Sequence, residues 1–413
     1  MEQATRQPMA GGAPSVEELV SGRYTRVPPG PPTNSLWGRP GSISLAGGIP
    51  DPDSLPVEQI RNAYQTVLER EPKQALEYGP VEGFATLREY VATLICAEPG
   101  VDMKADNVTL TSGSSHSLSN IVDAFADPGD VILVEQPTFL GALRTFLSSG
   151  AEVVGIPMDS DGLETDALNA TLTTLRRDGR KVKFLYTIPT FHNPAGTTMA
   201  LERRQALVEI AERQRLLVVE DDPYGRLRFR GDPLPSLFSL SAGKGVLGVG
   251  TFSKLIATGL RAAWVIGEKQ YIDALNSTRY DAGSSQLTER MIAAYIEAGY
   301  LEPQIERLVK VYRDKCDTMM RALDERCAGY VSYDRPDGGY FIWVRLPEGL
   351  KSPAFAEIAL AEGVSIVPGT VSMTKPELGH PYIRLAFSYV PQKDIFDSIQ
   401  RLGRAFEKAT ATA

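Results

Sequence analysis

The stretch Val246–Gly267, VLGVGTFSKLIATGLRAAWVIG, has the pattern of a strand, a polar turn and a second strand, and it gives the first indication of fold and chemistry. Its two ends, Val246–Phe252 and Ala262–Gly267, are apolar and rich in β-branched residues, which predicts two buried strands. The polar turn between them carries two cations, Lys254 and Arg261. A desolvated amine has a lowered pKa and attacks aldehydes, whereas a planar guanidinium suits a phosphate. The pair suggests a phosphorylated aldehyde, but the turn alone is equally compatible with a solvated lysine.

The composition is that of an ordinary globular protein. The chain has 413 residues, 43% hydrophobic and 23% charged, with a formal net charge of -8 and an isoelectric point of about 5.2. The acidic balance and the absence of a long basic run argue against binding to nucleic acid. No run approaches the roughly 18 apolar residues of a membrane span, and the N-terminus lacks an apolar signal core. Three cysteines without metal-ligand spacing are typical of a reducing compartment, so we expect a cytoplasmic protein with no metal site.

The order of predicted elements indicates the fold class. Residues 1–40 are rich in proline, glycine, serine and threonine, which predicts a flexible arm. Between Asn107 and Glu220, apolar strands alternate with helices, and this predicts a doubly wound, mostly parallel sheet with helices on both faces. A long amphipathic helix follows at Leu301–Cys327. Three strands then predict a smaller α+β unit; they lie in Gly338–Leu346, Val364–Pro368 and Pro381–Phe387.

Ligands of such sheets bind beyond the carboxyl ends of the strands, where several polar motifs of this chain fall. The first is TSGSSH, residues 111–116, which leaves a strand and opens a helix. Ser114 and Ser115 would lie at the positive end of the helix, where backbone N–H groups bind phosphate. The alternative is a simple helix cap. Phe139 follows the next strand and could stack on a flat ring, or belong to the core.

Two further motifs follow later strands. In PTFHNPAG, residues 189–196, prolines flank the Asn193 loop and predict a rigid segment that can contain a cis bond. Asn193 could donate to a phenolate oxygen. In LLVVEDDPY, which ends at Tyr224, a carboxylate could keep a pyridine nitrogen protonated, so that the ring draws electrons from a substrate. Paired aspartates after a strand also occur in metal and phosphate sites.

Arg384 stands in an otherwise apolar strand, YIRLAF. A buried arginine needs a partner, and a substrate carboxylate held by two hydrogen bonds is a natural one. An internal salt bridge is the alternative.

Taken together, these motifs resemble those of the fold-type I pyridoxal 5'-phosphate (PLP) aminotransferases, class I/II, of the aspartate aminotransferase superfamily. The likeness is greatest to the branch that holds the α-aminoadipate and kynurenine aminotransferases and the MocR effector domains. It rests on LAGGIPDPDSLP, YGPVEGFATLREYV, PTFHNPAG, VEDDPYGRL, FSKLIATGLRAAWVIG and YIRLAF, and runs from about Ser44 to the C-terminus. It implies an α/β fold with a large PLP-binding domain at 76–300. The smaller domain would comprise 41–75 and 301–413.

The resemblance also implies a role for each matching residue. Lys254 would form the aldimine with PLP and move the proton between Cα and C4′, through a quinonoid. Asp221 would pair with the pyridine nitrogen, Asn193 and Tyr224 would bond the ring oxygen, and Phe139 would stack on the ring. The phosphate would be held by Ser114, Ser115, Thr251, Ser253 and Arg261, with Tyr78 reaching across from a neighbouring subunit of a homodimer with shared sites. Arg384 would bind the α-carboxylate of the amino-acid or 2-oxo-acid substrate, and Gly47, Gly48 and Asn193 would also contact the substrate.

Two histidines depart from the usual pattern of the branch. His116 and His192 stand where amides are more common, beside the expected cofactor. They could replace the amides as hydrogen-bonding groups. One could instead be an extra acid/base group, which would suit other PLP chemistry, such as β- or γ-elimination, replacement, decarboxylation or oxidation. A transcription regulator with this fold would need a winged helix-turn-helix in front, and the proline-rich arm predicts none.

Overall fold

The computed structural model describes residues 15–27 and 41–411. Most of the predicted arm, residues 1–40, lies outside these ranges. Its described part forms two short helices, α1 (Val16–Leu19) and α2 (Gly22–Arg26), and α2 packs against α8 (Leu140–Ser149).

The large part of the molecule is built on an eight-stranded sheet with the order β2-β9-β8-β7-β6-β3-β4-β5. The strands from β8 to β4 in this order are parallel, whereas β9 is antiparallel to both its neighbours and the short β5 is antiparallel to β4. The bounds are β2 (Val108–Thr111), β3 (Val131–Gln136), β4 (Glu152–Asp159), β5 (Gly162–Leu163), β6 (Val182–Thr187), β7 (Leu217–Asp222), β8 (Val246–Thr251) and β9 (Ala263–Ile266). The doubly wound, mostly parallel sheet is therefore confirmed.

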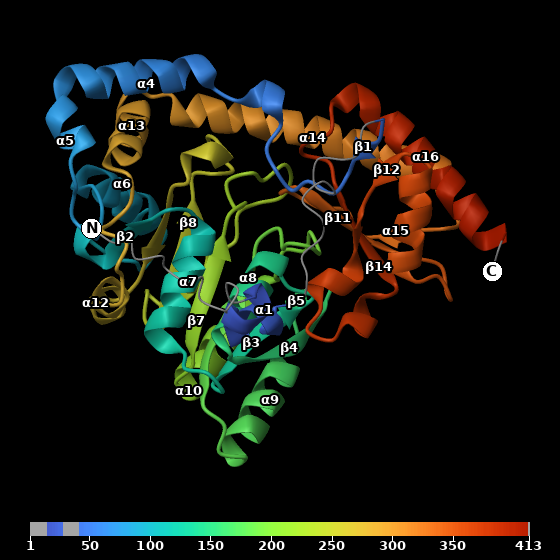
Figure 1. Cartoon of the computed structure of the whole chain (residues 1–413), viewed down its shortest axis with the longest axis horizontal. Coiled ribbons are helices and arrows are strands. Elements are labelled where there is room, and N and C mark those ends of the chain that lie inside the picture. The colour runs from blue at the N-terminus through green and yellow to red at the C-terminus, as the bar shows by residue number, and fades with distance from the viewer. Residues whose placement is uncertain (1–14, 28–40, 412–413) are drawn as a thin grey trace, which may run out of the picture.

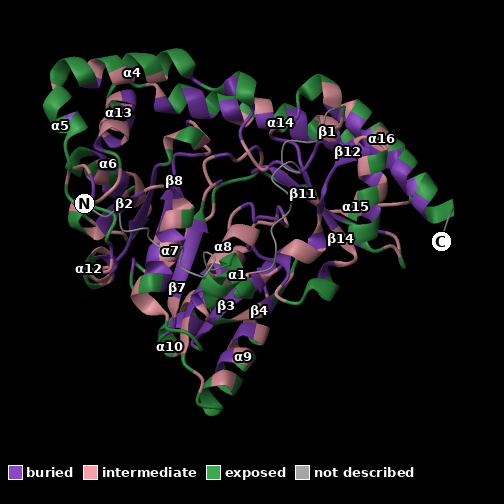
Figure 2. Ribbon diagram, viewed as in Figure 1, coloured by how far each residue is buried: buried purple, intermediate pink, exposed green. Residues whose placement is uncertain are grey.

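Helices cover both faces of this sheet because alternate strand residues point to opposite sides. In β3, Ile132 and Val134 pack in one cluster, with α7 (Ser114–Phe125), α8 and α12 (Lys269–Ser277). Val131 and Leu133 pack in the other cluster, which includes residues of α6 (Ala85–Cys96), α9 (Thr165–Arg177), α10 (Leu201–Arg213) and α13 (Gln286–Glu297). Figure 2 shows the strands of the sheet buried and the outer surfaces of the helices exposed.

The helix α14 (Leu301–Arg326) runs from above the large sheet to the C-terminal part of the chain (Figure 1). There it packs on α16 (Gln392–Ala411) beside α15 (Ser352–Ala361) and an antiparallel sheet of order β10-β11-β14-β13. These strands are β10 (Ser332–Tyr333), β11 (Phe341–Arg345), β13 (Val367–Pro368) and β14 (Tyr382–Ala386). The single strand predicted at Val364–Pro368 is wrong. It is divided into β12 (Val364–Ser365), which pairs with β1 (Ile43–Ser44), and β13, which pairs with β14.

The chain from residue 41 onward joins the two parts. β1 belongs to the C-terminal part, but α4 (Val57–Arg70) and α5 (Pro72–Leu76) pack on α13 of the large part. The turn between β1 and α4 is fixed to α14 by a buried ion pair: Lys315 Nζ lies 2.8 Å from Asp51 Oδ1 and also donates to the Ser388 carbonyl at 2.8 Å. Ser54 donates to the other carboxylate oxygen of Asp51 at 2.5 Å.

Removing one member of this pair leaves the other charge buried and uncompensated. We expect Lys315→Met to lower the free energy of unfolding by about 3–5 kcal/mol, measured by urea denaturation. Lys310 lies on the same helix and is exposed, so Lys310→Met is the matched control and should change stability by about 0.5 kcal/mol or less. Equal stability of the two variants would contradict the role given to the pair.

Candidate active site

The loops that follow β2, β3, β6, β7 and β8 meet at one cavity of about 520 Å³, together with the Gly47–Ile49 segment, Phe341 of β11 and Arg384 of β14. The cavity wall contains every residue predicted for the site except Tyr78: Gly47, Gly48, Ser114, Ser115, Phe139, Asn193, Asp221, Tyr224, Thr251, Ser253, Lys254, Arg261 and Arg384. The wall also includes residues that the sequence analysis did not single out: Ile49, Leu140, Gly141, Arg144, Ile188, Pro223, Thr258 and Phe341. Ile49, Pro223 and Thr258 lie within the quoted motifs, next to predicted residues, whereas Arg144 and Phe341 reach the cavity from segments for which the sequence shows no motif.

Lys254 lies in the turn after β8 and points across the cavity. Its Nζ donates to the Gly48 carbonyl at 3.1 Å and lies 5.7 Å from the centre of the Tyr340 ring. Burial, together with the charges of Arg384 and Arg261, lowers the pKa of Lys254 to about 8, against the opposing effect of Asp221. The amine therefore has a much larger neutral, nucleophilic fraction near neutral pH than an exposed lysine.

Asp221, in β7, is only 3% exposed, and its two carboxylate oxygens differ in their surroundings. Tyr186 donates to Oδ2 at 2.7 Å, while the buried Oδ1 has no hydrogen-bond partner within the described residues. Burial raises the pKa of Asp221 to about 7, and the Tyr186 hydrogen bond acts in the opposite direction. A cationic N–H donor in the cavity would satisfy Oδ1 and keep the carboxylate ionised.

The segment that precedes α7 forms an anion cradle beside Arg261. The amides of Ser114 and Ser115, at the start of α7, make no hydrogen bond within the described part of the chain. Gly113 has φ +94°, and a Cβ there would lie 2.4 Å from Arg261 Nη2, so only glycine admits the guanidinium. Arg261 Nη2 donates to the Ser112 carbonyl at 3.3 Å. Free amides, a helix N-terminus and a guanidinium together suit a phosphate.

The hydroxyl of Thr251 holds the turn around Lys254. It donates to the Ala262 carbonyl at 3.0 Å and accepts from the Ser253 amide at 3.1 Å. Thr251 therefore lines the cavity while stabilising the two strand ends from which Lys254 projects.

Arg384 lies in the cavity wall contributed by β14, and it forms no ion pair with an acidic side chain of the described residues. Its Nη1 donates to Asn193 Oδ1 at 3.0 Å and its Nη2 to the Ala46 carbonyl at 2.6 Å, while the guanidinium lies 4.4 Å from the Phe341 ring centre. Its buried Nε has no hydrogen-bond partner among the residues that the structure describes, and burial lowers the pKa of Arg384 to about 10. The geometry favours an external carboxylate over the internal salt bridge that the sequence also allowed.

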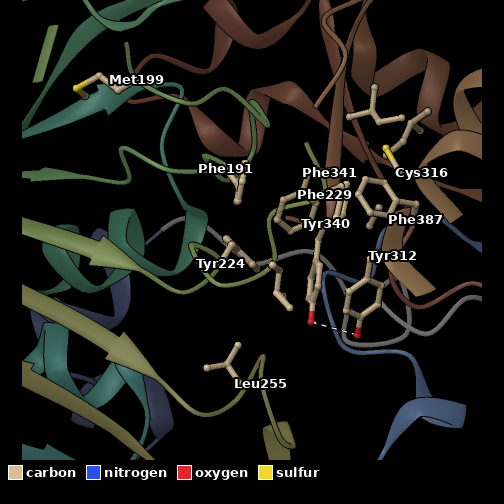
Figure 3. Close-up of a cluster of buried hydrophobic side chains, with 14 of the residues drawn as sticks. Phe191, Met199, Tyr224, Phe229, Leu255, Tyr312, Cys316, Tyr340, Phe341 and Phe387 are labelled. Atoms are coloured by element: carbon tan, nitrogen blue, oxygen red, sulfur yellow. Dashed lines mark hydrogen bonds between the residues drawn. The ribbon is translucent and has the colours of Figure 1, made fainter. Parts of the chain in front are cut away.

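Aromatic side chains complete the walls. Tyr224 is 3% exposed, and burial raises the pKa of its hydroxyl. Its ring packs 5.0 Å from Tyr340, whose hydroxyl donates to Tyr312 of α14 at 3.3 Å (Figure 3). Phe139 immediately precedes α8, and a Cβ at Gly141 would lie 2.4 Å from its Cζ, so this glycine leaves room for the ring. The Asn193-Pro194 peptide bond is cis, and it lies in the loop, residues 189–196, for which the sequence allowed a cis bond.

Tyr78 lies outside the cavity and is 92% exposed. Its predicted contact with the phosphate of a neighbouring subunit stays a prediction.

The two histidines share one arrangement, in which Nδ1 accepts a backbone amide and Nε2 faces a carboxylate. His116 Nδ1 accepts from Ser112 at 3.1 Å, and its Nε2 lies 3.2 Å from Asp281 Oδ2. His192 Nδ1 accepts from Ala195 at 3.2 Å, and its Nε2 lies 3.1 Å from Glu135 Oε2. Neither histidine lines the cavity. The geometry favours hydrogen-bonding roles that shape the neighbouring loops over an extra acid/base role.

We expect His192→Leu to lower the free energy of unfolding by about 1–3 kcal/mol, because the Ala195 amide loses its acceptor and Glu135 then faces an apolar group. His192→Asn, which keeps an acceptor near the Nδ1 position, should recover part of this loss in the same urea titration. His380→Leu is the control, since the His380 side chain makes no hydrogen bond within the described residues, and should cost about 0.5 kcal/mol or less. No loss in His192→Leu would contradict the structural role.

The described residues lack two other kinds of feature, a metal cluster and a membrane-spanning helix. In the part of the chain that the structure describes, no three His, Cys, Asp or Glu side chains are grouped to hold a metal ion. Among the helices of residues 15–27 and 41–411, none combines the length and apolar character needed to cross a bilayer.

Comparison with known proteins agrees with this geometry. Residues 41–402 match the family aminotransferase class I and II. The chain belongs to this family. It is 38% identical over 368 residues to aromatic-amino-acid aminotransferase 1 of Thermococcus litoralis, covering 89% of this chain and 88% of the relative. It is 34% identical over 377 residues to 2-aminoadipate transaminase of Thermus thermophilus, covering 90% of this chain and 92% of that relative.

The solved structures confirm the predicted fold-type I architecture. The multiple substrate aminotransferase of Thermococcus profundus superimposes with a TM-score of 0.90 at 33% identity, covering 96% of this chain and 99% of that one. The family membership and these relatives confirm the prediction that the chain is an aminotransferase.

Proposed function

We propose that this aminotransferase binds PLP in the cavity and moves an amino group between an α-amino acid and a 2-oxo acid. The observation that carries the proposal is the buried Asp221 Oδ1, an acceptor without a partner in the described residues, in the same cavity as the amine Lys254 with its lowered pKa. A protonated pyridine nitrogen supplies the donor that Oδ1 lacks, and an aldehyde is the natural partner of the amine.

The remaining residues fit the rest of the cofactor. The free amides of Ser114 and Ser115, with Arg261, suit its phosphate. Phe139 offers a ring for stacking. Because Asn193 Oδ1 already accepts from Arg384, Asn193 Nδ2 is left to donate to the ring oxygen, alongside the Tyr224 hydroxyl. When bound, PLP is an electron sink that stabilises negative charge on the substrate's Cα.

The protein's own groups then have distinct tasks. Arg384 binds the substrate's α-carboxylate, and its hydrogen bond to Asn193 links substrate position to the cofactor ring. Lys254 Nζ would hold the cofactor's aldehyde carbon and, when free, would be the base that takes the proton from the substrate's Cα and returns it on the cofactor's side. The Gly48 carbonyl, 3.1 Å from Nζ, orients the amine. Gly47 and Gly48 also bring backbone close to the substrate, where a Cβ at Gly48 would clash with Phe341 at 2.6 Å.

The proposal extends to a cytoplasmic homodimer. The three cysteines are free, as is usual in a reducing compartment. Tyr78 and Tyr280 are 92% and 96% exposed, and their segments adjoin, since a Cβ at Gly283 would lie 2.9 Å from the Pro80 carbonyl. We propose that this surface contacts the partner subunit and that Tyr78 reaches the partner's phosphate site. The molar mass in solution, measured by light scattering, tests the dimer: a monomer would rule it out.

Lys254→Ala tests the proposed chemistry. We expect the variant to lose turnover and the visible absorbance that the cofactor acquires when a lysine holds its aldehyde, because no other lysine lines the cavity. Asp221→Asn should lower kcat/KM by about 30- to 5,000-fold, since breaking a buried charge pair costs about 2–5 kcal/mol. Lys244→Ala, at an exposed position, is the control and should match the wild type. Full activity of Lys254→Ala would overturn the proposal.

A further inference from the structure

Tyr186 of β6 lies behind the cavity wall and is the side chain that donates a hydrogen bond to Asp221 among the described residues. The sheet sets this contact. Tyr186 pairs in register with Val219 of β7, and Val219 and Asp221 are two residues apart, so all three side chains leave the sheet on the same face. The tyrosine hydroxyl therefore lies 2.7 Å from Asp221 Oδ2, on the side away from the unpartnered Oδ1.

The surroundings of Tyr186 hold its hydroxyl in place as a donor. The side chain is completely buried, and its ring packs edge-on against Phe146 of α8 with the ring centres 5.4 Å apart. Burial raises the pKa of the hydroxyl well above its ordinary value, so the proton stays on the tyrosine. The hydroxyl can then only donate to the carboxylate oxygen that faces it.

The hydrogen bond favours the ionised form of Asp221, whereas burial opposes it and raises the pKa of this carboxyl to about 7. Other groups act on the pair through their charge. Asp222 and Lys254 act on Asp221, and Tyr224 and Glu135 on Tyr186. None of these four donates a hydrogen bond to Asp221 within the described residues, so the Tyr186 hydroxyl has no substitute there.

We propose that Tyr186 is a positioning residue, whose hydroxyl orients the Asp221 carboxylate and keeps it ionised so that Oδ1 meets the ring nitrogen of PLP as an anionic acceptor. The inference rests on the proposed function. A carboxylate held at Oδ2 cannot rotate without leaving a buried hydroxyl unpaired, which fixes Oδ1 toward the cavity. A neutral Asp221 would lack the charge that keeps the ring nitrogen protonated.

Cofactor binding to the apoenzyme tests the inference without turnover. The probe is pyridoxamine 5'-phosphate, the aminated cofactor, which cannot form a bond with Lys254. We expect Tyr186→Phe to weaken its binding by about 10-fold near pH 8, because the carboxylate must then ionise without its donor. In the Asp221→Ala background, where no carboxylate remains to be oriented, the same substitution should change the dissociation constant less than twofold.

Tyr333→Phe is the matched control, because Tyr333 also donates to an aspartate, Asp324, at 2.7 Å, but far from the cavity wall. It should leave cofactor binding unchanged. Wild-type affinity in Tyr186→Phe, or an equal loss in the Asp221→Ala background, would overturn the inference alone. A wild-type protein that binds neither form of the cofactor overturns the proposed function.

The stability of the apoenzyme gives a second readout. The folded pKa of Asp221 lies above its unfolded value, so stability falls as the pH rises toward about 7. Without the Tyr186 hydroxyl the folded pKa is higher, and the fall continues to higher pH. The urea midpoint of Tyr186→Phe should therefore drop further below the wild type at about pH 8.5 than at about pH 5.5. A deficit that is the same at both pH values would show packing alone and overturn the inference.

Discussion

Parallel strands that end at one edge of a sheet are the constraint on which this site depends. The strands β3, β6, β7 and β8 run in the same direction, so the residues that follow or end them are brought together although they are far apart in the sequence. Phe139, Asn193, Asp221 and Lys254 come from four such strand ends. The antiparallel β9 returns the chain beside β8 and places Arg261 next to the segment that opens α7. The sheet thus gathers the groups that the proposal assigns to the ring, the aldehyde and the phosphate of one ligand.

Burial gives these groups their reactivity. The same loss of solvent lowers the pKa of Lys254 and Arg384 and raises that of Asp221. The same burial makes an unpaired charge on Arg384 or Asp221 costly, which suits the first to a carboxylate and the second to a protonated ring nitrogen, and it leaves Lys254 a larger neutral fraction that can attack an aldehyde. The smaller, C-terminal part of the protein forms the remaining wall of the cavity. It contributes Arg384 and Phe341, while the Lys315–Asp51 pair holds the segment whose Gly48 carbonyl meets Lys254.

The sheet and most residues at its strand ends could be predicted from the sequence, because the alternation of apolar and polar segments indicates where each strand ends. The loops after β6 and β7 and the Lys254 turn follow from that pattern, and the cavity contains their predicted residues.

The direction in which a side chain points does not follow from this pattern. His116 and His192 are adjacent to cavity residues but turn toward Asp281 and Glu135, since their Nδ1 atoms accept backbone amides. Arg144 gave no signal because a single arginine on an amphipathic helix normally lies in solvent. The division of Val364–Pro368 between two sheets depends on β1, which pairs from a distant part of the chain.

The most direct test of the central claim is a single-turnover titration of the purified enzyme with an amino acid and no 2-oxo acid, followed by absorbance and product analysis. A lysine-anchored cofactor that accepts the amino group should lose its visible band and release one equivalent of 2-oxo acid per bound PLP, after which the reaction stops. Addition of a 2-oxo acid should restore the band. Continuous product formation without an acceptor would contradict the account, because it would show elimination, replacement, decarboxylation or oxidation instead of amino-group transfer.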